Sequence, residues 1–404
     1  MSSRPQAMPT SSSSAAVDPP DEARPGELEV CGVGRFPADR VVELGEAHAA
    51  QAEAAVADFI ASLRSDGDER RHVAGLFLQR AADMEAAASA DLQAATQRCG
   101  ADAACLEDAG QSRFDVMTHT AEAASEEIAR LAMASHDPFT YAVAMQACGP
   151  IGVTPVAAPS CRLLSAEQWA RVDPGNAVPW LHVAAAAKAR KDTAALDEAI
   201  YRVSTATSNT LHGYALYGYA ASHLPAGASA FEQVQLFMFV TGAVAGQVPP
   251  YQTVAQYCAA SALHDSNRWQ ACDALARNFV ERPSTLIERR IGERIGERAR
   301  WPPEKIAARR EEDDAMGQAQ AELLPALQPL GCRAVKGRRD YLLQVSRLGE
   351  FGAARATMVA SGRSVATLAA QARSERDAVA LAAAAEAASQ PASTPYSAAP
   401  PPAR

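Results

Sequence analysis

The sequence predicts an all-α protein, an irregular stack of antiparallel helical hairpins, and three observations support this prediction. Alanine supplies much of the 48% hydrophobic content, while aromatic residues make up only 6% of the chain. This composition favours closely packed helices, because alanine combines the best helix propensity with a small side chain. Many segments place apolar residues at helical spacing after Asp, Asn or Pro, which suit helix starts. No stretch alternates in the manner of a strand, so we expect no β-sheet.

The two ends of the 404-residue chain differ from the part between them. Residues 1–29 and 389–404 are rich in Ser, Pro and Ala and carry too little apolar surface to form a core, so we expect both to be disordered. The part between them divides into an N-terminal helical region at 30–148, a helical-hairpin region at 149–362 and a C-terminal helix at 363–388. A chain of this length is typical of two or three domains.

Four helices are expected in the N-terminal region, and the residues at their starts support them. Asp68 and Asp137 precede segments of helical periodicity, where an aspartate accepts hydrogen bonds from amides that the helix leaves unpaired. Pro37 and Pro138 suit a first turn, because proline lacks the amide that would be unpaired there. The expected helices span about residues 37–63, 68–98, 111–134 and 138–148.

Residues 172–206 contain the clearest pattern in the chain. Two runs, one after Asn176 and one after Asp192, each place apolar residues at positions i, i+3, i+4 and i+7, which share one face of a helix. Two such helices joined by a short turn must pack against each other to bury these faces. The expected core of this hairpin consists of Trp180, Val183, Ala184, Ala187, Leu196, Ala199, Ile200 and Val203.

This segment resembles a tetratricopeptide repeat. In "DPGNAVPW", Pro174 matches the end of one unit and Trp180 the aromatic position of the next, Val183 and Ala184 fall at the family's Leu-Gly pair, and Asp192 lies in the inter-helix turn. The later "DEAI" falls three residues too far on. The resemblance implies a surface that binds another polypeptide. The alternative is that this pattern is only an effective helix junction.

The resemblance does not extend to a regular array. A weaker match, "LGEFGAARA" at 348–356, lacks the aromatic residue in its first helix, and no regular step of about 34 residues connects it to the first unit. We therefore expect one tetratricopeptide-like hairpin in an irregular stack. The chain also resembles a group of bacterial proteins that share a "CGxG" opening and a "DPxNAxxWL" segment, and this resemblance implies no activity.

Six of the eight cysteines fall into three close pairs, which we expect to be disulfides. Cys258 and Cys272 are each seven residues from Asp265, so they would lie at one height in a hairpin that turns there. The second pair flanks a loop rich in Pro and Gly, and the third brackets the short connection "GADAA". The other pairs are Cys148 with Cys161 and Cys99 with Cys105. The alternative is that these are small buried side chains; pairing of Cys31 with Cys332 is left open.

The compartment signals conflict. Paired cysteines favour the periplasm or cell envelope, because disulfides persist in oxidising surroundings. The N-terminus shows no apolar segment after Arg4, which taken literally indicates the cytoplasm. The two agree if a signal or anchor precedes the chain as given. The longest apolar run, at 237–245, is half of the roughly 18 to 20 residues that span a bilayer, so we expect a buried helix there and no membrane span.

Chemistry-bearing patterns are sparse, and we expect no catalytic, cofactor-binding or metal-binding residues. His119 has a carboxylate four residues earlier, Asp115, but a surface ion pair is the simpler interpretation. Cys31 lies beside two glycines without a basic neighbour, which favours a turn or extended segment over a nucleophile. No cysteine has the spacing of a zinc site. The arginine-rich run "RRIGERIGERARW" at 289–301 is interpreted as a solvated, ion-paired helix face whose glycines admit a neighbouring helix.

The expected function is that of a non-enzymatic helical scaffold or protein-interaction protein. Its partner is expected to be a protein or peptide, and the net charge of -9 argues against nucleic acid. One alternative is an envelope enzyme whose active site assembles from dispersed His, Asp and Glu residues. Another is a folded domain that binds through disordered ends.

Overall fold

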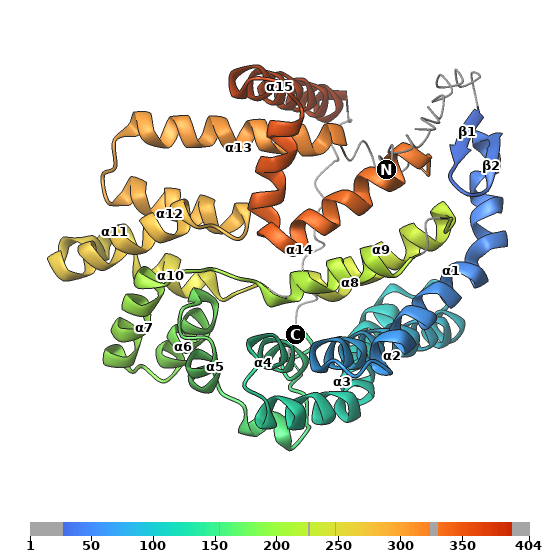
Figure 1. The fold of residues 1–404 in the computed structure, drawn as a ribbon, viewed down its shortest axis with the longest axis horizontal. Helices are drawn as coiled ribbons and strands as arrows, with labels where there is room; N and C mark the ends of the chain where they lie inside the picture. Colours follow the sequence, from blue (N-terminus) through green and yellow to red (C-terminus); the bar gives the residue numbers. More distant parts are fainter. Residues whose placement is uncertain (1–26, 153, 225–226, 247, 324–329, 390–404) are drawn as a thin grey trace, which may run out of the picture.

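Helices dominate the computed structural model, which confirms the all-α class (Figure 1). The structure describes residues 27–152, 154–224, 227–246, 248–323 and 330–389. The tails expected at 1–29 and 389–404 lie outside these ranges, except for residues 27–29 and Ser389. The expectation for residues 27–29 was wrong, because they belong to a strand.

A small β-hairpin precedes the helices and corrects the expectation that the chain has no sheet. Strand β1 (Glu27–Val30) pairs antiparallel with β2 (Gly34–Pro37). Its turn depends on Gly32, whose φ of 77° suits glycine. Backbone hydrogen bonds join Cys31 to Leu330 at 2.8 Å and to Ala230 at 2.7 Å, so segments distant in sequence hold this hairpin in place.

The N-terminal helices begin largely where their capping residues predict. Asp68 accepts from Arg71 N and Asp137 accepts from Thr140 N. The first helix begins four residues later than expected, after a 3-10 turn (Ala38–Arg40), and the third begins eight residues earlier, because Asp102 caps it. The four helices are α1 (Val41–Arg64), α2 (Glu69–Cys99), α3 (Ala103–Ala134) and α4 (Pro138–Ala147).

The hairpin expected at 172–206 forms from α6 (Ala177–Ala189) and α7 (Thr193–Thr205), after the short α5 (Ala166–Val172). Asn176 and Asp192 cap the two helices, as the pattern indicates. Trp180 and Leu196 are half-buried and pack against the same core, and the Trp180 Nε1 donates to the Pro174 carbonyl at 3.2 Å. The remaining expected core residues are buried: Val183, Ala184, Ala187, Ala199, Ile200 and Val203.

The rest of the chain, as far as the structure describes it, forms eight further α-helices. Figure 1 shows α8 and α9 across the middle of the molecule, with α1–α4 on one side and α13–α15 on the other. The last two correspond to the 348–356 segment and the C-terminal helix expected at 363–388. Their bounds are α8 (Ala215–His223), α9 (Ala230–Ala245), α10 (Tyr251–Tyr257), α11 (Ser266–Glu281), α12 (Leu286–Arg298), α13 (Pro303–Leu323), α14 (Cys332–Ala360) and α15 (Val365–Ser389).

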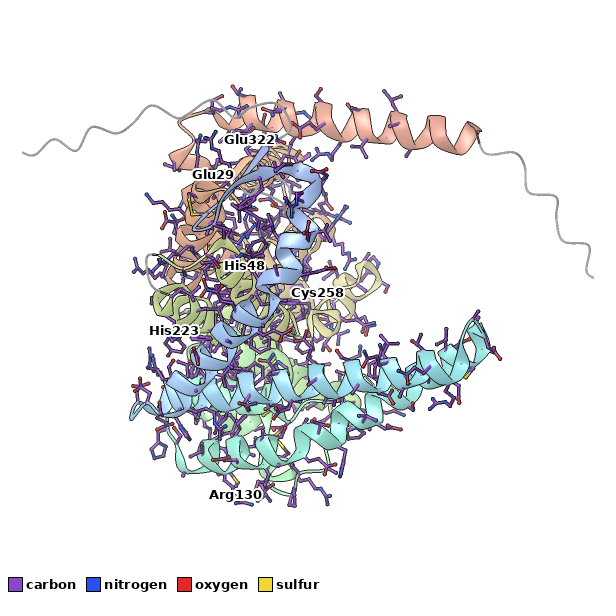
Figure 2. All side chains as sticks on the ribbon, turned by 90° about the vertical axis from the view of Figure 1, so that its right-hand side faces the viewer. Glu29, His48, Arg130, His223, Cys258 and Glu322 are labelled. Atoms are coloured by element: carbon purple, nitrogen blue, oxygen red, sulfur yellow. A yellow bond between two sulfur atoms is a disulfide. The ribbon has the colours of Figure 1, made fainter. Side chains whose placement is uncertain are left out.

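Two large cores hold these helices together. The first combines residues of α1, α2, α3 and α4 with residues of α8, α9 and α14. The second joins α5, α6 and α7 to α10, α11 and α12. Because the first core draws on both sides of residue 148, the boundary expected there separates stretches of sequence but not separate cores. Figure 2 shows α15 and the far half of the α2–α3 hairpin projecting from the same side of the body, at opposite ends.

Four disulfides tie the described part of the chain. The three expected pairs, Cys99–Cys105, Cys148–Cys161 and Cys258–Cys272, lie at bonding distance. The fourth, Cys31–Cys332, is the pair that the sequence left open, and it joins positions 301 residues apart. Cys258 ends α10 and a 3-10 turn (Ala260–His264) follows it, so this pair does not bridge a simple two-helix hairpin.

The arginine-rich run expected as a solvated face is partly buried, which corrects that expectation. Arg289 is 4% exposed and lies 3.0 Å from Asp313 and 2.6 Å from Glu312, both on α13. Burial raises the pKa of Asp313 to about 7, against the opposing effect of Arg289. The glycines do admit neighbours, since a Cβ at Gly292 would lie 2.9 Å from Phe279 of α11.

Candidate functional site

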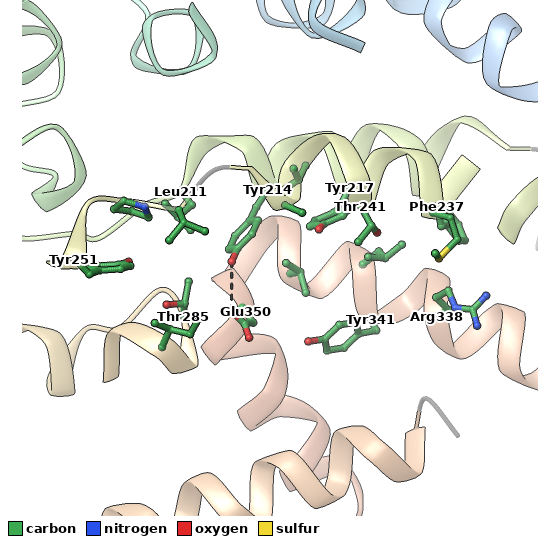
Figure 3. Close-up of a pocket in the computed structure, with 18 residues that line it drawn as sticks. Leu211, Tyr214, Tyr217, Phe237, Thr241, Tyr251, Thr285, Arg338, Tyr341 and Glu350 are labelled. Carbon is green, nitrogen blue, oxygen red and sulfur yellow. Dashed lines mark hydrogen bonds between the residues drawn. The ribbon is translucent and has the colours of Figure 1, made fainter. Parts of the chain in front are cut away.

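A cavity of about 420 Å³ lies between α8, α9 and α14 (Figure 3). Volumes of this order are typical of sites for small organic ligands. The lining comprises Leu211, Tyr214 and Tyr217 around the start of α8; Phe237, Met238, Thr241, Val244 and Ala245 of α9; Val248, Pro249 and Tyr251 at the start of α10; Thr285 and Ile287 at the start of α12; and Arg338, Tyr341, Leu342, Val345 and Glu350 of α14.

Helical periodicity explains why α9 and α14 each present one continuous face to the cavity. On α9, residues 237, 241 and 244 stand at positions i, i+4 and i+7. On α14, residues 338, 341, 342 and 345 stand at i, i+3, i+4 and i+7. Residues at this spacing share a helix face, so two facing helices form the long walls.

A break in α14 sets the position of the only carboxylate among the described lining residues. Gly349 has a φ of 73°, which interrupts the helix. The amide of Phe351 then donates to the Ser284 carbonyl at 3.1 Å, so the interrupted turn of α14 is hydrogen-bonded to the loop before α12. A Cβ at Gly349 would lie 3.0 Å from that same carbonyl oxygen. The break therefore requires glycine, and it brings Glu350 to the cavity wall.

Tyrosine hydroxyls, Glu350, Arg338 and two threonines form the polar part of the lining. The Tyr214 hydroxyl points at Glu350, 3.5 Å from its Oε2 (Figure 3). Burial raises the pKa of Glu350, although the hydrogen bond from Tyr214 opposes this shift. Burial likewise raises the pKa of Tyr341 to about 12. These groups are therefore partly shielded from solvent, and Tyr214 and Glu350 are paired with each other.

The mouth of the cavity is apolar. Met238, Val248 and Ile287 line it and are 53%, 63% and 56% exposed. Large apolar side chains that gather at the opening of a concave site, rather than singly on the surface, are typical of a binding surface. The cavity is thus open to solvent through an apolar rim.

The structure does not bring the sequence-predicted His119 and Asp115 together. His119 is exposed, and its nearest ion-pair partner is Glu122 at 3.4 Å. Asp115 instead accepts from the Thr154 hydroxyl at 3.1 Å. Cys31 is bonded to Cys332, which agrees with a turn position and not with a free nucleophile. None of the three candidates, His119, Asp115 and Cys31, lines the cavity.

A different histidine–carboxylate pair forms, one that the sequence did not indicate because 39 residues separate its members. His212 Nε2 lies 2.8 Å from Asp173 Oδ2. Burial acts to raise the pKa of Asp173, but hydrogen bonds from His212 and Asn176 outweigh it, and the pKa is lowered. Because Asn176 also accepts from Thr210 N, this cluster joins the turn before α6 to the segment before α8.

The described residues contain no group of three or more His, Cys, Asp or Glu arranged to hold a metal ion. None of the described helices has the apolar run that a membrane crossing requires. Comparison of the chain with family models, curated proteins and solved structures finds no match. The geometry of the cavity is therefore the basis for assigning a function.

Proposed function

We propose that this chain is a non-enzymatic helical binding protein whose recognition site is the cavity between α8, α9 and α14. The observation that supports this most strongly is a largely apolar cavity that opens to solvent through an apolar rim. Its described lining includes neither histidine nor cysteine, and its single carboxylate is engaged by Tyr214. A lining of this kind suits binding by apolar burial, with little chemistry to offer a substrate.

The disulfides agree with a binding protein of an oxidising compartment, such as the periplasm or cell envelope. The tetratricopeptide resemblance of α6 and α7, and the protein or peptide partner that it implies, remain predictions. The cavity lies outside that hairpin, so a partner bound to α6 and α7 and a ligand bound in the cavity are compatible.

A variant that blocks the cavity tests the proposal. Thr241 is exposed at the rim, so Thr241→Trp places an indole over the cavity without entering the core. We expect the wild-type chain to bind the neutral apolar dye N-phenyl-1-naphthylamine, with a fluorescence increase, and the variant to bind it at least about tenfold more weakly, since the dye would lose most of its buried area.

The matched control is Gln235→Trp, an exposed position on the same helix that does not line the cavity. This variant should bind the dye as the wild type does, and circular dichroism should show both variants equally helical. No dye binding by the folded wild-type chain, or equal binding by Thr241→Trp, would contradict the proposal.

A further inference from the structure

The tyrosine hydroxyls that line the cavity already have partners within the protein. Tyr217 hydrogen-bonds to Thr241 and Tyr251 to Thr285. The Tyr341 hydroxyl accepts from Gln320 Nε2 at 2.6 Å. With Tyr214 directed at Glu350, each of the four lining hydroxyls has a side-chain partner, although Tyr341 only accepts and keeps its proton to donate. The other hydroxyls offer a ligand little further hydrogen bonding.

Arg338 is the exception. No carboxylate or carbonyl among the described residues lies within hydrogen-bond or salt-bridge distance of its guanidinium, although the side chain is half-buried. Burial lowers the pKa of Arg338, and no neighbouring negative charge offsets this effect. By contrast, Arg376 and Arg70, on exposed helix surfaces, each pair with an aspartate. A half-buried guanidinium without an anion favours an anionic ligand.

The position of Arg338 fixes the orientation of such a ligand. Figure 3 shows Arg338 with Phe237 at one end of the cavity and Tyr251 with Thr285 at the other. Between these ends the walls carry apolar side chains of α9 and α14, such as Val244, Leu342 and Val345, and also the paired Tyr214 and Glu350. An anionic group at the Arg338 end therefore leaves an apolar body to lie along the two helices.

We propose that the cavity binds a single-chain amphiphile with a carboxylate head, which pairs with Arg338 while the alkyl chain extends towards Tyr251. This inference rests on the proposed function and names the ligand class of the same site. Arg338 is the single cationic residue among the described lining residues, so a monoanion matches it. A peptide is a poorer fit, because its backbone amides would face hydroxyls that are already paired.

Competition against the neutral dye tests the head group on the full-length oxidised protein. Dodecanoate, dodecan-1-ol and dodecyltrimethylammonium share one chain length and differ in charge, so a difference between them reports on the head group. Each is used as a monomer, below its micellar concentration or, for dodecan-1-ol, below its solubility limit. We expect dodecanoate to displace the dye at a concentration at least about tenfold lower than dodecan-1-ol, because a charge-assisted hydrogen bond is added. Dodecyltrimethylammonium should be the weakest competitor.

Arg338→Gln should bring the ratio of dodecanoate affinity to dodecan-1-ol affinity close to one, from the roughly tenfold expected for the wild type. The matched control is Arg339→Gln, the next residue of α14, which does not line the cavity and should keep the full preference. An intact preference in Arg338→Gln would overturn the assignment. Tighter binding of dodecyl phosphate than of dodecanoate would overturn the choice of a carboxylate.

The outcomes separate this inference from the proposed function. If the dye and dodecan-1-ol bind but dodecanoate has no advantage, the anionic head is wrong and the apolar binding site stands. If neither the dye nor any amphiphile binds the folded chain, the proposed function fails, and the assignment of its ligand fails with it.

Discussion

Replacement of both Cys31 and Cys332 by serine should lower the free energy of unfolding by about 5 kcal/mol, the upper end of what a disulfide contributes. This bond joins positions 301 residues apart, so it restricts nearly the whole unfolded chain. In the folded protein it ties the β1–β2 turn to the start of α14, next to Val335 in a small separate core. Urea unfolding of the oxidised double variant measures the loss.

The matched control is the double serine variant of Cys99 and Cys105. The disulfide that it removes closes a loop with a separation of only 6 residues, at the tip of the α2–α3 hairpin. The same loop-entropy argument gives a loss of about 2 kcal/mol there. Equal losses for the two double variants, or a larger loss at the hairpin tip, would contradict the assignment of the Cys31–Cys332 bond as the main constraint on the unfolded chain.

Glu288→Gln should stabilise the protein relative to wild type, and the difference should grow with pH. Glu288 is fully buried at the start of α12, and burial raises its pKa from 4.5 to about 8, although hydrogen bonds from Ser284 N and Thr285 N oppose this shift. Two buried oxygens here, Glu288 Oε1 and Asn209 Oδ1, have no partner among the described residues. A proton on Glu288, or the amide of glutamine, supplies a donor to this site.

The sign of the pH dependence follows from proton linkage. Between pH 4.5 and 8 the folded protein keeps the Glu288 proton, whereas the unfolded chain has lost it. The stability that this proton contributes is therefore fully present below pH 4.5 and is lost as the pH rises to about 8. Glutamine does not titrate. The advantage of Glu288→Gln over wild type should therefore increase by about 1.4 kcal/mol per pH unit between pH 5 and 8 and then level off.

Urea unfolding at a series of pH values measures the difference in stability between Glu288→Gln and wild type. Other groups with shifted pKa values, such as Asp313 and His182, are present in both proteins, so their titration cancels in this difference. Glu281→Gln is the matched control, since it replaces an exposed carboxylate at the end of α11 and leaves the buried Glu288 site unchanged. A difference for Glu288→Gln that stays constant from pH 5 to 8 would show that this carboxyl titrates normally.

Much of the helical architecture was predictable because its signals are local. The caps at Asp68, Asp137, Asn176 and Asp192 act within three residues of themselves, and each begins a helix as expected. The same is true of the close cysteine pairs. The β-hairpin was missed because its strands are four residues long and it is held by Cys332, at the other end of the chain.

The features that the sequence did not predict depend on contacts between segments that are far apart in the chain. The run around Arg289 has internal i, i+3 partners and therefore predicts a solvated face, but α13 brings Asp313 and Glu312 against it and buries it. Likewise, the cavity joins Tyr214 and Tyr341, which are distant in sequence and have no pattern in common. The aromatic residues of a chain with few of them cluster here because the fold places α8 and α14 side by side.

The most direct test of the account is to locate the bound ligand by photolabelling. A neutral dodecane that carries a diazirine, irradiated with the full-length oxidised protein and mapped by peptide mass spectrometry, should label α9 between residues 237 and 245 and α14 between residues 338 and 345. Thr241→Trp should abolish this labelling, whereas Gln235→Trp should retain it. Labelling spread over the exposed helices, or confined to α2, α3 or α15, would contradict the cavity as the binding site.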